Sequence, residues 1–127
     1  MDQSIRGYLA NLEQQGELVR FQKEVDPLEN LTAIGWKTYD RLGKGSLFDN
    51  LKGFPEWKVC NQILIDRRKW GIGLGVSEQE VIETFNTRVK SPIDTVMVDA
   101  AQAPIKEVIL KDEDVDLTKI PAAWTSE

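Results

Sequence analysis

The sequence predicts an α+β domain: a small mixed β-sheet packed by about four helices, with an extended C-terminal tail. Three observations predict this class. Apolar residues recur at helical spacing in several segments, short runs with strand-like alternation lie between the first of them, and capping residues or glycines mark most boundaries. The chain has 127 residues and 41% hydrophobic content, which suits one domain with a core that needs no disulfide or metal.

The first helix and the first strand are expected within residues 4–25. Ser4 is a suitable N-cap, and Gly16 favours the left-handed conformation that ends a helix. Between them, the apolar residues at helical spacing are Ile5, Tyr8, Leu9 and Leu12. Residues 17–25 alternate in polarity and are expected to form a strand.

A second helix and two strands are expected next. Asp26 and Pro27 combine a cap with proline at the first helical position, so the helix is predicted to run from there to a stop at Gly43. Its expected core-facing residues are Leu28, Leu31, Gly35, Tyr39 and Leu42. The strand candidates 46–51 and 57–64 flank a turn, and this arrangement predicts a hairpin.

The stretch 59–75 combines a strand, a turn, two adjacent arginines and a helix interrupted by glycines, and Asp66 is the expected cap of that helix. Each glycine lowers helix propensity by up to about 1 kcal/mol relative to alanine, so a close packing neighbour is expected there. The glycine spacing matches neither a dinucleotide-binding fingerprint nor a phosphate P-loop. We therefore interpret the stretch as the packing centre of the domain.

A fourth helix and a tail complete the chain. Ser77 and Glu80 form a capping box. The apolar stripe of the helix that follows consists of Val81, Ile82, Phe85 and Val89. Pro92 ends this helix, and residues 106–110 are the last strand candidate. Beyond them the chain reads as an acidic turn and an extended segment.

Composition excludes several classes of function. The net charge of −5 and the scattered basic residues argue against nucleic acid as a partner, because phosphate contacts need clustered Lys and Arg. No apolar run approaches the length of a membrane span and the N-terminus lacks a signal core, so we expect no membrane and a cytoplasmic location. The single cysteine, Cys60, excludes an intrachain disulfide, and its apolar neighbours predict a buried, unreactive thiol.

Candidate sites are few. Arg67 and Arg68 follow Asp66 in the first turn of a helix, where guanidinium and free backbone N–H groups could hold a phosphate or carboxylate. The alternative is a solvated turn or a salt bridge to a nearby acid. The chain has no histidine and no catalytic pair or triad emerges, so we expect no catalytic residue and no metal ligand within it. The alternating Asp residues of 112–116 lack the glycine and glutamate of a calcium loop.

Four segments, in order, carry a family resemblance: SIRGYLANLEQQGELVRFQKEVDP, GSLFDNLKGFPEWKVCNQIL, DRRKWGIGLG and IKEVILKDEDVDLTKIP. Together they resemble the N-terminal region of the UbiD family of reversible (de)carboxylases, which use prenylated FMN (prFMN). Each motif is weak alone, but the ordered set covers essentially the whole chain. The tail departs from the family pattern, because Pro121 is followed by neither a second proline nor a histidine.

The resemblance implies a domain division and a set of cofactors. Residues 1–110 are expected to form the family's small N-terminal α+β domain, and residues 111–127 to lead into a flavin-binding domain or a partner subunit. In the family, the catalytic acid–base residues, prFMN, a divalent metal (Mn or Mg) with Asn, His and Glu ligands, and a candidate potassium ion belong to the complete enzyme. None of these cofactors is expected to be bound by this chain alone.

The resemblance also implies a function. We expect a scaffold domain or small subunit of an enzyme that (de)carboxylates aromatic or unsaturated carboxylic acids, inactive by itself. Its partner would be the remainder of a UbiD-like chain or a separate catalytic subunit, in a homo- or hetero-oligomer. The alternative is a non-catalytic assembly or regulatory module that binds such a subunit. A third hypothesis is a small anion-binding domain that uses Arg67 and Arg68.

Overall fold

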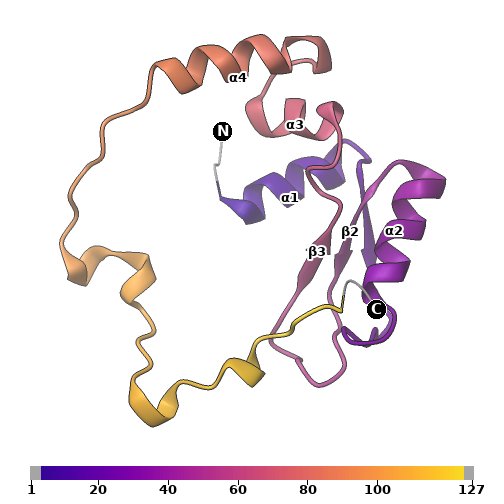
Figure 1. The fold of residues 1–127 in the computed structure, drawn as a ribbon, viewed down its shortest axis with the longest axis vertical. Coiled ribbons are helices and arrows are strands. Elements are labelled where there is room, and N and C mark those ends of the chain that lie inside the picture. Colours follow the sequence, from indigo (N-terminus) through magenta and orange to yellow (C-terminus); the bar gives the residue numbers. More distant parts are fainter. Residues whose placement is uncertain (1–3, 125–127) are drawn as a thin grey trace.

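A computed structural model describes residues 4–124 and confirms the α+β class (Figure 1). Its centre is a mixed sheet of strand order β1-β2-β3, made of β1 (Leu18–Phe21), β2 (Gly45–Phe48) and β3 (Val59–Asn61). β1 runs parallel to β2, whereas β3 pairs with β2 in the antiparallel direction, which confirms the predicted hairpin. Residues 125–127 of the predicted tail lie outside the described residues.

Within the described residues, the four predicted α-helices are all present. They are α1 (Ile5–Gln14), α2 (Leu31–Leu42), α3 (Arg67–Leu74) and α4 (Val81–Lys90). α2 covers one face of the sheet, and α1 and α3 cover the other (Figure 1). The sheet therefore lies between two helical layers.

Most of the predicted helix ends are confirmed by their local geometry. The Ser4 hydroxyl group accepts a hydrogen bond from the Gly7 N–H at 3.1 Å and caps α1. Gly43 and Gly75 take φ angles of 67° and 72° at the ends of α2 and α3, in the left-handed region that favours glycine. The predicted capping box also forms before α4.

β2 is buried on both faces and separates two apolar clusters. Toward α1 and α3, the buried cluster consists of Leu12, Leu18, Leu47 and Ile72. Toward α2, the buried cluster consists of Val25, Leu31, Phe48 and Leu51. Successive side chains of a strand point to opposite faces, so the neighbours Leu47 and Phe48 contribute to one cluster each. Phe21 of β1 stacks on Phe48 with the ring centroids 5.0 Å apart.

α2 begins about one turn later than Asp26 and Pro27 predict. The Asp26 carboxylate accepts the Leu28 N–H at 2.9 Å and the Lys52 ammonium group at 2.9 Å, so it closes a turn instead of capping the helix. Leu28 therefore lies before the helix and is exposed, and Leu42 in the last turn is exposed as well. The buried face of α2 consists of Leu31, Gly35 and Thr38.

α4 packs on α3 with only a small part of its apolar stripe. Val81 is buried, whereas the rest of the predicted stripe is exposed: Ile82, Phe85 and Val89. Phe85 makes an edge-to-face contact with Trp70 of α3, and the two ring centroids lie 6.3 Å apart. The predicted amphipathic helix is present, but most of its apolar side is uncovered by the described residues.

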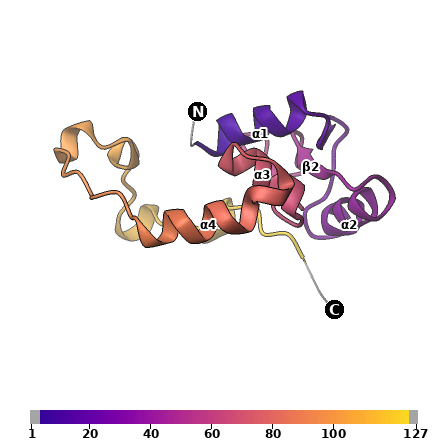
Figure 2. The ribbon, with the colours of Figure 1, turned by 90° about the horizontal axis from the view of Figure 1, so that it is seen from above.

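Residues 91–122, which we call the arc, leave α4 and follow an open curve away from the sheet before they return to it (Figures 1 and 2). Among the described residues the arc contains short 3-10 turns and no strand, so the predicted strand at 106–110 is wrong. A strand needs a neighbouring strand for its hydrogen bonds, and the sheet lies apart from these residues. The chain returns where the Trp124 N–H donates to the Pro27 carbonyl oxygen at 3.1 Å.

Gly35 of α2 is expected to resist enlargement while Asn61 stays in place, because a Cβ atom at residue 35 would lie 2.7 Å from Asn61 Nδ2. We expect Gly35→Ala to lower the free energy of unfolding by about 1–3 kcal/mol through overpacking. Asn61→Ala removes the clash, so the double variant should recover part of this loss, with a coupling of at least about 0.5 kcal/mol. Urea denaturation of the unchanged chain, the two single variants and the double variant measures the coupling. Strictly additive effects would contradict the close approach of residue 35 to Asn61.

Candidate functional site

Arg67 and Arg68, the residues of the predicted anion site, begin α3 directly after its cap. The Asp66 carboxylate accepts the Lys69 N–H at 3.0 Å and fixes the first turn. Arg68 Nε lies 3.2 Å from Glu17 Oε2 and forms an ion pair. Arg67 instead lines an apolar groove against α4. The structure thus directs the two side chains to different surroundings, and the anion site stays a prediction.

Lys69, which the sequence presents as part of an exposed basic run, is the central side chain of this region and is fully buried. Its ammonium group donates to the Gly43 carbonyl oxygen at 2.6 Å and to Asp66 Oδ2 at 2.5 Å. The same group lies 3.6 Å from Glu17 Oε2 and 5.3 Å from the centroid of the Tyr39 ring. The buried charge is therefore surrounded by acceptors.

Two cations and two carboxylates meet here, and we call Glu17, Asp66, Arg68 and Lys69 the Lys69 cluster. Its formal charges balance. Burial alone would raise the pKa of Asp66, but hydrogen bonds from the Lys69 ammonium group and backbone N–H hold that pKa below its ordinary value, and the charges of Lys69 and Arg68 act in the same direction. Removal of one partner would leave an uncompensated buried charge.

The Lys69 cluster lies where several elements begin or end. Glu17 precedes β1, Gly43 ends α2 shortly before β2, and Asp66 caps α3. The sequence does hold a signal for it. Asp66 and Ile72 lie three residues to either side of Lys69, and this spacing puts all three on one face of a helix. Because Ile72 belongs to the core, Lys69 shares the buried side of α3.

Tyr8 of α1 holds α3 and the loop before it. Its hydroxyl group donates to the Ile63 carbonyl oxygen at 2.6 Å and lies 3.0 Å from the Lys69 carbonyl oxygen. Burial, and then the nearby Asp66 and Cys60, raise the pKa of Tyr8 to about 12. Burial also raises the pKa of the half-buried Cys60 thiol, which supports the predicted low reactivity.

Two apolar grooves border α3. One, of about 340 Å³, lies between α1 and α3 and is lined by residues that include Tyr8, Ile63 and Trp70. The other, of about 310 Å³, lies between α3 and α4 and is lined by residues that include Arg67, Trp70 and Phe85. Neither lining includes a carboxylate or a cysteine. The grooves could receive an apolar segment, but they hold no acid–base pair.

Residues 4–124 contain neither a group of side chains that could hold a metal ion nor a helix that could cross a membrane. In this range no group of three or more His, Cys, Asp or Glu side chains is placed to hold a metal ion. The sequence has no histidine and so does not supply the complete Asn, His and Glu ligand set that the family resemblance implies. No helix in the same range is long and apolar enough to cross a membrane.

The sequence is similar to known decarboxylase sequences. Residues 9–89 match the family model described as the 3-octaprenyl-4-hydroxybenzoate carboxy-lyase N-terminal domain. The gallate decarboxylase of Lactiplantibacillus plantarum is 30% identical over 117 residues, a match that covers 81% of this chain and 23% of that protein.

Solved structures share the fold. An evolved dimeric form of the UbiD-class enzyme HmfF from Pelotomaculum thermopropionicum, in complex with prFMN, matches with a TM-score of 0.81 and 31% identity over 98% of this chain and 29% of that one. The 3,4-dihydroxybenzoic acid decarboxylase AroY of Klebsiella pneumoniae matches with a TM-score of 0.80 and 27% identity over 93% of this chain and 27% of that one. The chain thus spans less than a third of the length of these relatives.

Replacement of Lys69 tests the Lys69 cluster. Lys69→Met keeps an apolar side chain but leaves Glu17 and Asp66 without their buried counter-ion, so we expect the free energy of unfolding to fall by about 3–5 kcal/mol. Arg67→Met, at the exposed neighbouring position, is the matched control and should change it by less than about 0.5 kcal/mol. Urea denaturation gives both values. Similar losses in the two variants would count against the cluster.

Tyr8 predicts lower stability at alkaline pH. Its pKa is about 12 in the folded chain and ordinarily 10.0, so between these values the unfolded chain has lost the phenol proton while the folded chain keeps it. The free energy of unfolding therefore falls as the pH rises through this window. Urea midpoints at a series of pH values check this. Tyr8→Phe should flatten the fall and Tyr39→Phe should keep it, and parallel curves for all three proteins would refute the prediction.

Proposed function

This chain belongs to the UbiD N-terminal domain family, described as the N-terminal domain of 3-octaprenyl-4-hydroxybenzoate carboxy-lyase, and we propose that it is a scaffold domain or small scaffold subunit of a UbiD-class decarboxylase. The observation that carries this proposal is the family match over residues 9–89, which includes the sheet and α3. The similar gallate and 3,4-dihydroxybenzoic acid decarboxylases support an aromatic or related unsaturated carboxylic acid as the substrate of the whole enzyme.

A scaffold role agrees with how the ionisable groups are used. Lys69, Asp66 and Glu17 are committed to one another in a buried cluster, and the Tyr8 hydroxyl group is committed to backbone carbonyl oxygens. None of these groups is left to transfer a proton to a substrate. We assign prFMN, any divalent metal and the catalytic acid–base residues to a part of the enzyme other than this chain.

The alternative is a non-catalytic assembly or regulatory module that binds a UbiD-like catalytic subunit. The observation that favours it is the exposure of Trp124, which is 64% exposed although its backbone is held against the domain. A large aromatic side chain presented in this way is typical of a surface that another polypeptide covers. The two candidates differ in whether the catalytic portion needs this chain for turnover.

An exchange experiment distinguishes these functions. The matching N-terminal segment of Lactiplantibacillus plantarum gallate decarboxylase is replaced by this chain, and CO₂ release from gallate is measured. We expect turnover by the exchanged enzyme and none by a variant that lacks the segment, because the scaffold is required for the site to form. The isolated chain, supplied with prFMN and Mn²⁺, should release no CO₂.

Two outcomes would contradict the scaffold proposal. Turnover by the isolated chain would mean that it holds an active site of its own. Undiminished turnover by the variant without the segment would mean that the segment is dispensable for catalysis, and this result would favour the assembly or regulatory module.

A further inference from the structure

The chain exposes more surface than a compact protein of its mass. Its solvent-accessible surface is 10069 Å² and its mass is 14.4 kDa. A compact monomer of that mass exposes about 6,800 Å², so roughly 3,000 Å² is in excess. One partner's share of a standard protein–protein interface is about 800 Å². The excess is several times larger and matches a permanent interface better than a transient one.

The excess surface is concentrated in the arc. From Ser91 to Ile120 every residue is exposed except Ala103, which is half-buried. The most exposed large apolar residues of the arc are Ile93, Val96, Met97, Ile105, Val108 and Leu117. Exposed large apolar residues in this number along one segment are typical of a site that another polypeptide covers.

Both ends of the arc are attached to the folded part of the chain. At its start, α4 packs on α3 through Phe85 and Trp70. At its end, the Trp124 N–H donates to the Pro27 carbonyl oxygen, and Ala123 packs against the apolar cluster beneath α2. The sheet with its helices, α4 and the arc thus form a ring around an opening (Figure 1). Because the arc is attached at both ends, it can enclose a folded polypeptide that occupies the opening.

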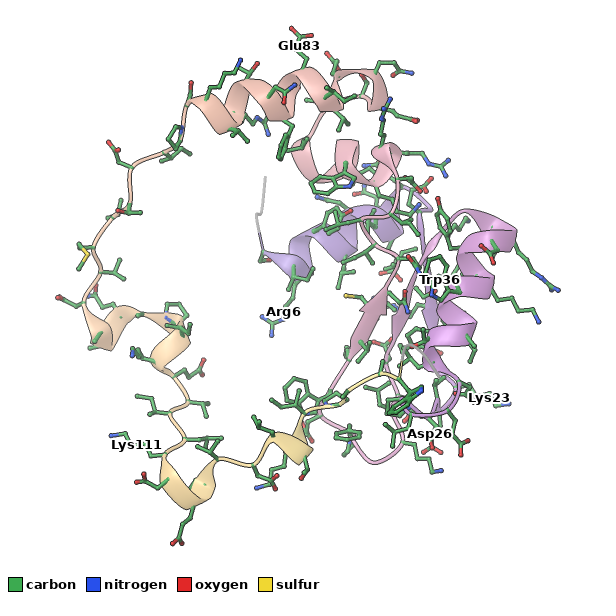
Figure 3. The ribbon with its side chains drawn as sticks, in the orientation of Figure 1. Arg6, Lys23, Asp26, Trp36, Glu83 and Lys111 are labelled. Atoms are coloured by element: carbon green, nitrogen blue, oxygen red, sulfur yellow. The ribbon has the colours of Figure 1, made fainter. Side chains whose placement is uncertain are left out.

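The apolar side of α4 faces the opening. In Figure 3, Glu83 of α4 points away from the opening, whereas Arg6 of α1 points toward it. Phe85 and Val89 follow Glu83 by two and six positions, and at roughly 100° per residue they lie on the opposite side of the helix. They are 47% and 62% exposed. The inner rim of the ring is therefore apolar along α4.

We propose that the arc and the inner side of α4 wrap around the remaining portion of a UbiD-class enzyme, an inference that rests on the proposed function. The similarity to HmfF identifies this occupant. That match covers 98% of this chain and so includes the arc, yet it makes up only 29% of the HmfF chain. A match of this coverage with a TM-score of 0.81 supports a similar course of the arc within a much longer protein, as expected if the additional residues fold inside the ring.

The test compares the chain as its own cells hold it, purified through a tag under native conditions, with the isolated chain. Trypsin cleavage at the arc residues Lys106, Lys111 and Lys119 is followed by mass spectrometry. In the native assembly we expect cleavage to be slower by roughly tenfold or more, because a covered segment opens rarely. We also expect flavin absorbance in the same assembly.

Two matched variants of α4 assign the protection to its inner side. Val89→Glu adds a charge that faces the opening, and Thr87→Glu adds the same charge one turn from Glu83, on the outer side. Val89→Glu should abolish the protection of the arc, and Thr87→Glu should keep it. In the isolated chain both variants should be cleaved at the same rate, since no partner covers either position.

Each other outcome overturns a defined part of the inference. If the arc in a flavin-containing assembly is cleaved as fast as in the isolated chain, the arc does not wrap around the partner. The proposed function is then still supported. A protected arc in an assembly that contains no UbiD-class polypeptide, whether the partner is a second copy of this chain or another protein, overturns the occupant and the proposed function together. A free monomer in the native preparation overturns both as well.

Discussion

The buried ammonium group of Lys69 is the constraint on which the sheet and its helices depend. A charge at this depth is tolerated only among acceptors, and here they are Glu17, Gly43 and Asp66. These residues belong to the segments that begin β1, end α2 and begin α3. A shift of any one segment would leave a charge without its partner, so their positions are set together. Such a cluster restricts the arrangement of elements more than it adds to net stability.

This constraint acts on one part of the molecule only. The sheet has a buried apolar cluster on each face, so its strands and α1, α2 and α3 have the contacts that a stable domain needs. α4 and the arc lack such contacts: most of the apolar side of α4 is exposed, and the arc has almost no buried residue. The sheet and its helices hold both ends of the arc, which suits a domain whose role is to position a larger body.

The helix ends could be predicted because their signals act within a few residues. Each of these signals acts on its own helix: the side chains of Ser4 and Asp66 accept backbone N–H groups of the first turn, and Gly43 adopts the left-handed conformation that ends the helix. Neighbouring residues are therefore sufficient to predict these helix ends. Strand lengths could not be predicted in the same way. The predicted strands 17–25 and 57–64 are longer than β1 and β3. A strand extends only as far as its partner, and β2 is short.

The sequence by itself determined the α+β class, most of the helix ends and the family, because these depend on short-range hydrogen bonds and on the order of motifs. Only the tertiary structure decided which faces are covered. Val81 and Val89 belong to one apolar stripe, yet Val81 is buried and Val89 is exposed. Lys69 belongs to a basic run, yet it is buried because Glu17 and Gly43, distant in sequence, surround it. Burial and charge pairing depend on contacts with segments that are distant in the sequence, so they cannot be predicted from neighbouring residues.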